Sequence, residues 1–192
     1  INGSTARAGT EPAVADEVRR EQVRLLHAQL PLGVASLLVA AIVTAALFWH
    51  AADPAFAAGW LTLVAAVGLA HLVAWGRRRK LGAAAEPRPD LAWFTVGAAL
   101  AGCVFGLAPV VFTSGGSFDS LAMLLTIVAM LGVAGVATFG ADLRVYLAFL
   151  LPLTLPATVR MLFEAHPAAP SMGALRLGFI AVLVVAAFQL RG

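Results

Sequence analysis

Residues 31–49 read PLGVASLLVAAIVTAALFW, a stretch without a single charged side chain. A helix of about 20 apolar residues is long enough to cross the hydrocarbon core of a bilayer, which is about 30 Å thick. Similar stretches follow at residues 56–76, 91–112, 121–141, 145–163 and 172–190. They are continuously apolar instead of alternating, which favours transmembrane helices over the strands of a barrel. We therefore predict an all-α fold, a polytopic bundle of six transmembrane helices.

The composition of the whole chain agrees with this prediction. Of its 192 residues, 61% are hydrophobic and 12% are charged, and the mean hydropathy is +0.91. Soluble domains average about 45 to 50% apolar and about 25% charged residues. Between residues 25 and 76 the only formal charge is Asp53, and between residues 91 and 141 it is Asp119. These two regions are therefore unsuited to the core and surface of a soluble domain.

The basic residues predict the orientation of the bundle. Cytoplasmic loops of membrane proteins carry an excess of Lys and Arg close to the ends of the spans. The chain has thirteen such residues, and with the N-terminus inside, all except Arg160 and Arg176 fall on the cytoplasmic side. We therefore predict N-in, C-in topology in a bacterial inner membrane. The run RRRK at residues 77–80 then anchors the bundle on anionic lipid, and we expect no nucleic-acid partner.

The charged N-terminal segment is expected to differ from the rest. Residues 1–12 are rich in small residues, and we interpret them as a disordered lead or a remnant of expression. Residues 13–30 are predicted to form a cytoplasmic amphipathic helix that lies along the membrane or pairs with a neighbour, because apolar residues recur there at helical spacing. Residues 31–190 form the six-helix domain. We interpret the chain as one module of a longer protein.

Three stretches resemble a known family. They are VRREQVRLLHAQLPLGVASLLVAAIVTAALFW at residues 18–49, GCVFGLAPVVF at 102–112, and AMLGVAGVATFGADLRVYLAFLLPLTLPATVRMLFE at 129–164. Together they look like the N-terminal six-span input regions of bacterial sensor histidine kinases and GGDEF diguanylate cyclases. The resemblance implies a sensory or dimerising module of a signal-transduction protein, such as a two-component system, whose output domain is absent from this chain. It brings no catalytic residues, so we expect no enzymatic activity from the chain itself.

Two pairs of glycines predict close helix packing. Gly102 and Gly106 form a GxxxG in the third span, and Gly132 and Gly135 give the fourth span a similar small face. Small residues let another backbone approach closely inside a membrane. The partner is either another helix of the bundle or a second copy of the chain, and the sequence does not separate the two. We expect a homodimer in the full-length protein.

Two prolines in the fifth span predict a hinge or the wall of a pocket. Pro152 and Pro156 lie on one face of the helix, and each removes an i to i−4 hydrogen bond and so frees a carbonyl group. In the alternative interpretation the helix is only kinked, and Thr154 and Thr158 bond back to the freed carbonyls. Pro109 predicts a comparable break in the third span.

The two arginines that break the charge bias form the candidate binding site. Arg160 lies near the outer end of the fifth span and Arg176 near the outer end of the sixth, with Glu164 and His166 between them. A charge at the centre of a span costs about 2.5 to 3.5 kcal/mol and usually faces protein or water. These four residues are predicted to line an outward-facing site for an anionic or polar small-molecule signal. Alternatively, both arginines extend to the lipid headgroups.

No metal or cofactor is expected. His71 is a candidate haem ligand, but we interpret it as a hydrogen-bonded histidine near the membrane interface. Cys103 is interpreted as a small packing residue, and the four tryptophans as an aromatic belt at the membrane surface. No paired carboxylates and no nucleophile with a base fall within a span, so catalysis is not expected.

Two other function classes remain open. Pro109, Pro152 and Pro156 are typical of the interrupted helices that line binding sites in small transporters. Against a transporter, the first four spans carry no acidic residue in mid-membrane to couple ions. The other class is a membrane anchor that dimerises the full-length protein without binding a ligand.

Overall fold

Only helices are present among residues 10–50, 52–81, 87–112, 118–162 and 166–189, the parts that the computed structural model describes. They are α2 (Thr10–Phe48), α3 (Pro54–Leu81), α4 (Pro87–Gly106), α5 (Ala108–Phe112), α6 (Phe118–Phe139), α7 (Leu143–Leu162) and α8 (Ala169–Gln189). Six regions of the described structure are long and apolar enough to cross a membrane, and each overlaps one of the six predicted stretches, although the first begins earlier, at Glu21. The predicted all-α class is confirmed.

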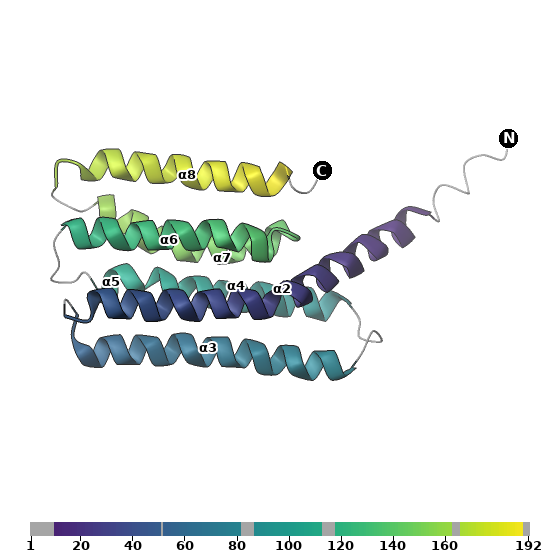
Figure 1. Ribbon diagram of the computed structural model, residues 1–192. Helices are drawn as coiled ribbons and strands as arrows, with labels where there is room; N and C mark the ends of the chain where they lie inside the picture. Colours follow the sequence, from purple (N-terminus) through teal and green to yellow (C-terminus); the bar gives the residue numbers. More distant parts are fainter. Residues whose placement is uncertain (1–9, 51, 82–86, 113–117, 163–165, 190–192) are drawn as a thin grey trace.

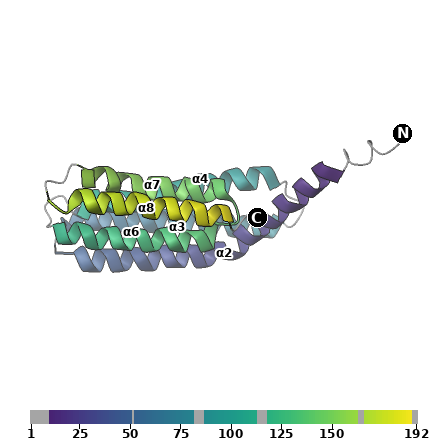
Figure 2. The same ribbon diagram turned by 90° about the horizontal axis from the view of Figure 1, so that it is seen from above.

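The helices run side by side along one common direction (Figure 1). α3 and α8 lie at opposite edges of the bundle, and α4 and α7 form the most extensive helix pair between them. The end of α2 and the start of α3 lie at one end of the bundle, which we call the distal end, as do the end of α7 and the start of α8. The end of α3, the start of α4 and the turn between α6 and α7 lie at the other, the proximal end, where α2 also enters the bundle. The view from above shows the same alignment (Figure 2).

α2 is one continuous helix, although two separate segments were predicted there. It runs through Pro31, and its N-terminal part projects beyond the proximal end of the bundle (Figure 1). Pro31 has no N–H to donate to the carbonyl oxygen of His27, four residues earlier. The indole Nε1 of Trp75 in α3 donates to that oxygen at 3.0 Å. A side chain from the neighbouring helix thus replaces the missing bond, and the helix continues.

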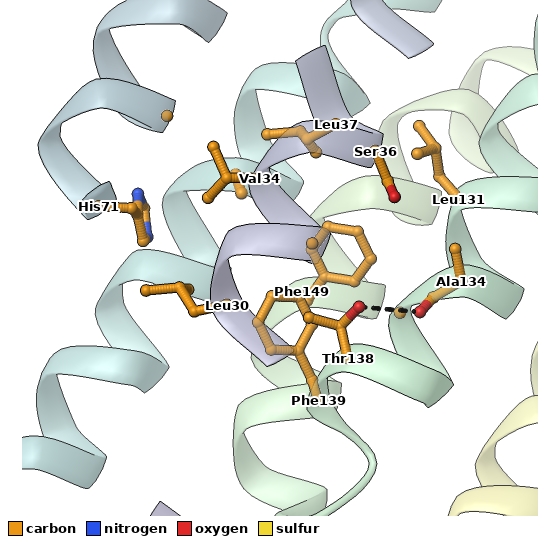
Figure 3. Close-up of a pocket in the computed structure, with 14 residues that line it drawn as sticks. Leu30, Val34, Ser36, Leu37, His71, Leu131, Ala134, Thr138, Phe139 and Phe149 are labelled. Atoms are coloured by element: carbon orange, nitrogen blue, oxygen red, sulfur yellow. Dashed lines mark hydrogen bonds between the residues drawn. The ribbon is translucent and has the colours of Figure 1, made fainter. Parts of the chain in front are cut away.

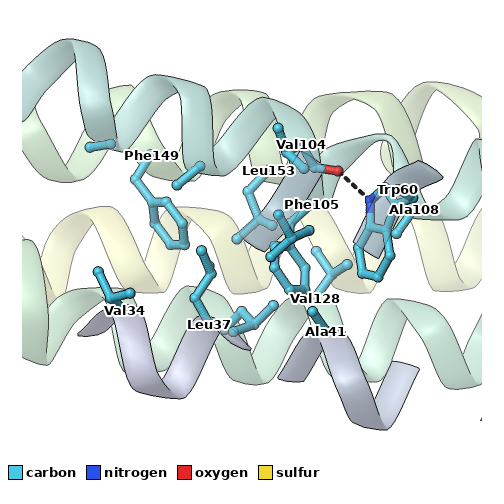
Figure 4. Close-up of a cluster of buried hydrophobic side chains, with 14 of the residues drawn as sticks. Val34, Leu37, Ala41, Trp60, Val104, Phe105, Ala108, Val128, Phe149 and Leu153 are labelled. Atoms are coloured by element: carbon cyan, nitrogen blue, oxygen red, sulfur yellow. Dashed lines mark hydrogen bonds between the residues drawn. The ribbon is translucent and has the colours of Figure 1, made fainter. Parts of the chain in front are cut away.

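The third predicted span is interrupted between α4 and α5 at Leu107, as Pro109 predicts. Two side chains from other helices bond to backbone carbonyls at this break. Nε1 of Trp60 donates to Val104 O at 2.8 Å (Figure 4). Nη1 of Arg160 donates to Pro109 O, also at 2.8 Å. Irregular backbone is tolerated at membrane depth where protein groups satisfy it. The interruption therefore has partners from α3 and α7.

Aromatic side chains fill the core beside this break. The ring of Trp60 meets Phe105 and Phe112 edge-on, with centroids 5.2 and 5.1 Å apart. Trp60 is only 4% exposed, so the aromatic-belt interpretation is wrong for this residue: its N–H has a partner inside the protein instead of at a headgroup. The packing interpretation of Cys103 is also wrong, because its side chain lies exposed on the surface of α4.

Aspartates begin two of the helices. Asp53 Oδ1 accepts from Ala55 N at 2.8 Å at the start of α3. Asp142 Oδ1 accepts from Arg144 N at 2.8 Å at the start of α7. Such caps satisfy N–H groups that have no partner within the helix. These two acids thus have a structural role at the helix ends.

Candidate functional site

Arg176 is the basic side chain that the bundle encloses most fully among the described residues. It lies about two turns into α8, is only 9% exposed, and faces α6 and α7. Its Nε donates to Thr158 Oγ1 of α7 at 3.2 Å, and its Nη1 donates to Leu125 O of α6 at 3.4 Å. One guanidinium group therefore joins three helices in the distal half of the bundle.

Two threonine hydroxyl groups near Arg176 bond to backbone carbonyls of α7. Thr158 Oγ1 accepts from the guanidinium and donates to Thr154 O at 2.9 Å. Thr154 Oγ1 in turn donates to Leu150 O at 2.7 Å. Both threonines are buried, so each hydroxyl needs a protein partner. Because the Thr158 hydroxyl donates to its own helix, its oxygen is a fixed acceptor for Arg176 on α7.

Arg160 and Arg176 lie at similar levels of α7 but on different faces of it. Arg176 contacts Thr158, and Arg160 is two residues further along, about 200° around the helix. Arg160 donates to Pro109 O at the α4 to α5 break, whereas Arg176 lies toward α6 and α8. The structure therefore gives each of the predicted site arginines its own set of contacts.

His166 lies at the entry to α8. Its ring is stacked on Phe118 at the start of α6, with centroids 3.8 Å apart and planes 10° apart. Its Nδ1 accepts from Ala168 N at 3.2 Å. The ring thus ties the start of α8 to the start of α6. Glu164, the fourth predicted site residue, lies outside the described residues.

The GxxxG of α4 faces the prolines of α7. A Cβ on Gly106 would overlap the carbonyl oxygen of Pro152. This oxygen lacks the usual helix bond because Pro156, four residues later, has no N–H. A Cβ on Gly102 would overlap Phe149 O and approach the ring of Pro152. The freed carbonyl of Pro152 is thus directed at the Cα of Gly106, a contact of the kind that stabilises close helix pairs.

The threonines of α7 do not bond to the carbonyls that the prolines free, contrary to the simple kink interpretation. The hydroxyls of Thr154 and Thr158 donate to the carbonyl oxygens of Leu150 and Thr154. The carbonyls that lose their helix bond to Pro152 and Pro156 are instead those of Ala148 and Pro152. A glycine of α4, and not a threonine of the same helix, lies against the Pro152 oxygen.

The other predicted glycine pair, in α6, faces two helices. A Cβ on Gly132 would contact Leu183 of α8 at 3.2 Å and Leu150 of α7 at 3.4 Å, and one on Gly135 would crowd the ring of Phe149. Both glycines, like those of α4, therefore lie against helices of the same chain.

A small pocket lies in the proximal half of the bundle, between α2, α3, α4, α6 and α7 (Figure 3). Its volume is about 40 Å³, room for water-sized molecules and far below the roughly 300 to 1,000 Å³ of ordinary ligand pockets. Its walls are mainly apolar, and His71 and Thr138 are among the residues that line it.

His71 Nδ1 bonds to Val67 O at 2.7 Å, so the residue is hydrogen-bonded as we interpreted. No cluster of three metal-binding side chains occurs among the described residues.

Comparison of the chain with protein-family models, with curated proteins and with solved structures found no match. The likeness to sensor input regions therefore stays a prediction.

Thr158 and Leu125 complete the contacts of Arg176, and sequence reasoning did not identify either as its partner. A search for hydroxyl groups near the level of each buried charge would have selected Thr158, whereas the backbone acceptor of Leu125 has no sequence signal.

Proposed function

We propose that this chain is a six-span membrane module that serves as the input region of a signalling protein, with α8 as the element that moves. The observation that carries the proposal is the buried guanidinium of Arg176, which holds the peripheral helix α8 to both α6 and α7. A polar contact between otherwise apolar helices has two discrete arrangements, made and broken. Such a two-state contact is what a signal needs in order to shift a helix.

The surface supports a membrane location. Large apolar side chains stand exposed on the helices, among them Ile42 (63%), Leu69 (63%), Met130 (68%) and Val182 (64%). Soluble monomers rarely expose contiguous apolar patches larger than a few hundred Å². Lipid tails, in contrast, match such faces without cost.

The distribution of charge supports an N-in orientation. Exposed basic side chains gather at the proximal end of the bundle: Arg24, Arg77, Arg79, Lys80 and Arg144. The distal half holds Arg160 and Arg176, and both bond to protein groups there. The proximal end is thus the cytoplasmic side under the positive-inside rule, in a bacterial inner membrane.

Cysteine labelling tests this orientation. In a Cys103→Ala background, His50→Cys reports the distal end and Lys80→Cys the proximal end, and both positions are exposed. A membrane-impermeant maleimide should label the first variant in intact spheroplasts, and the second only after permeabilisation. The reverse pattern would give the opposite topology, and equal labelling of both would contradict a spanning bundle.

Signalling is tested by fusing the full chain to a diguanylate cyclase domain and measuring cyclic di-GMP in cells. Arg176→Gln should change the output at unchanged membrane levels, because it weakens the contact that holds α8. Arg144→Gln, at an exposed arginine outside this contact, is the matched control.

Output that survives replacement of the whole bundle by an unrelated dimeric anchor would favour the ligand-free anchor instead. Uptake of a solute into vesicles would favour the transporter, for which the interrupted α4 to α5 segment is the supporting feature.

A further inference from the structure

The guanidinium of Arg176 has an unused donor in a buried place. Its Nη2 is shielded from solvent and has no hydrogen-bond partner among the described residues, although the side chain is more than nine-tenths buried. An arginine carries five N–H donors and no acceptor. Buried donors without a partner are rare because each costs its full desolvation free energy. Nη2 is therefore a donor without an acceptor.

The positive charge of Arg176 is also without a counter-charge in the described part of the chain. Its two partners are the uncharged Thr158 hydroxyl and the Leu125 carbonyl, and the latter lies at a long 3.4 Å. Leu125 belongs to a buried apolar cluster with Leu121, Ala157 and Met161. A buried cation in such surroundings is strongly destabilising unless an anion accompanies it.

We propose that Arg176 binds an oxyanion, a carboxylate or phosphate group, between α6, α7 and α8. A guanidinium N–H forms a strong, charge-assisted hydrogen bond with an oxygen of such a group. Nε and Nη1 are directed at α7 and α6, which leaves Nη2 to receive the ligand. The oxyanion is then the signal of the input module proposed above. The inference rests on that proposed function for the side of the membrane from which the anion enters. It accounts for the two anomalies, the orphan donor and the unpaired charge, with one ligand group.

The source of the oxyanion is either a lipid phosphate or a free solute. Arg176 lies about two turns from the start of α8, or about 10 Å along the helix, which is within reach of a headgroup. α8 is at the edge of the bundle and packs chiefly on α7 and α6. Both sources present the same chemistry to Nη2, and binding experiments distinguish them.

The test is binding to the full chain, purified in a maltoside detergent that contains no phosphate. Thermal unfolding is followed while inorganic phosphate or acetate is added at constant ionic strength, and in a second arm while short-chain phosphatidic acid is compared with uncharged diacylglycerol. A ligand that binds only the folded state raises the Tm in proportion to the logarithm of its concentration once the site is saturated. Native mass spectrometry then counts the lipids or ions retained.

We expect one of the two arms to raise the Tm, and to do so through Arg176. Arg176→Gln should weaken binding about ten- to a hundredfold, the worth of a charged hydrogen bond. Arg144→Gln is the matched control, since it removes an exposed guanidinium of α7 at the proximal end and should leave the anion response unchanged. Should Arg176→Gln fail to fold, Arg176→Lys keeps the charge but removes the Nη2 donor, and it should bind the anion more weakly than the wild type.

Three results would overturn the proposal. The wild type could show no stabilisation by any of these anions up to tens of millimolar, or equal stabilisation in wild type and Arg176→Gln. The third result concerns Glu164: if Glu164→Gln alone gains an anion response, the chain supplies its own counter-charge. None of these measurements uses the signalling fusion, so a failure of anion binding and a failure of signalling are seen separately.

Discussion

Single side chains make the polar contacts that hold this apolar bundle together. Trp60, Trp75, Arg160 and Arg176 each donate to a backbone carbonyl of another helix. For Trp75 the acceptor is the carbonyl that a proline frees, and for Arg160 it is the carbonyl of a proline at a helix break. In an apolar medium an unsatisfied carbonyl costs several kcal/mol. Trp75 and Arg160 therefore donate where proline interrupts the regular helix bonds, whereas Arg176 donates to a carbonyl of α6, a helix without proline.

The contact of Gly106 with α7 predicts a sharp intolerance of larger residues. Gly106→Ala should destabilise the folded state by about 1 to 3 kcal/mol, because the added Cβ meets the Pro152 carbonyl, which belongs to the backbone and cannot rotate away. Gly178→Ala in α8 is the control, since no atom lies within 4 Å of its Cβ position, and it should be neutral or slightly stabilising. Thermal unfolding of the purified variants measures both. Equal Tm values for the two would contradict the α4 to α7 packing.

At the scale of the elements, prolines decide which helices continue and which break. α2 passes through Pro31, and α7 passes through two prolines, yet the segment before Pro109 splits into α4 and α5. A group from another helix lies at His27 O in α2 (Trp75), at Pro152 O in α7 (Gly106) and at the α4 to α5 break (Trp60 with Arg160). The continuity of a helix is thus a property of its neighbours as well as of its own residues.

A double-mutant cycle tests this explanation for α2. Trp75→Phe should cost about 1 to 3 kcal/mol in the wild type, because His27 O loses its replacement donor. In a Pro31→Ala background the cost should fall, since the new N–H at position 31 bonds to His27 O within the helix. Unfolding free energies of the four proteins give the coupling.

Trp49→Phe serves as the control for loss of an indole. Trp49 is 41% exposed at the end of the first span, so the change should have little effect in either background. A Trp75→Phe cost that is the same with and without Pro31 would show that the indole does not act through the freed carbonyl.

At the scale of the whole molecule, the bundle has an apolar core crossed by a few polar contacts, and many large apolar side chains also stand exposed on its surface. A soluble protein carries mostly polar and charged side chains there, so this surface fits lipid as the surrounding solvent. The N-terminal part of α2 is the exception, because it projects beyond the bundle and carries the exposed ion pair of Arg24 with Glu21 at 2.6 Å. The molecule thus presents a lipid-compatible body and a polar extension.

This difference predicts opposite effects of a new charge on the two parts. Ile42→Arg, near the middle of the first span and 63% exposed, should reduce membrane insertion by about 2.5 to 3.5 kcal/mol. Glu17→Arg, on the exposed polar extension, should leave insertion unchanged. The inserted fraction is measured by carbonate extraction of membranes. Normal insertion and stability of Ile42→Arg would show that this face does not contact lipid.

Sequence alone accounts for the helical class, the position of the apolar segments and the break before Pro109, since each depends on the composition of a few neighbouring residues. It also singles out Arg160 and Arg176 by their departure from the charge bias. It misjudged Trp60 and Cys103, because the face of a helix that a neighbour covers is not visible in a span that is apolar on all sides. For the same reason it left the partner of the GxxxG open, where the structure has α7.

The sequence by itself thus determined that this chain forms six apolar helices, because the free energy of transfer into an apolar medium depends on local composition. Only the tertiary structure decided which donor meets which carbonyl. The partners of Trp60, Trp75, Arg160 and Arg176 are 44, 48, 51 and 51 residues away along the chain. Such pairs form only when the helices pack, and no local pattern encodes them. The separation of the two arginines onto different faces of α7, and with it the unpaired donor of Arg176, follows from that packing.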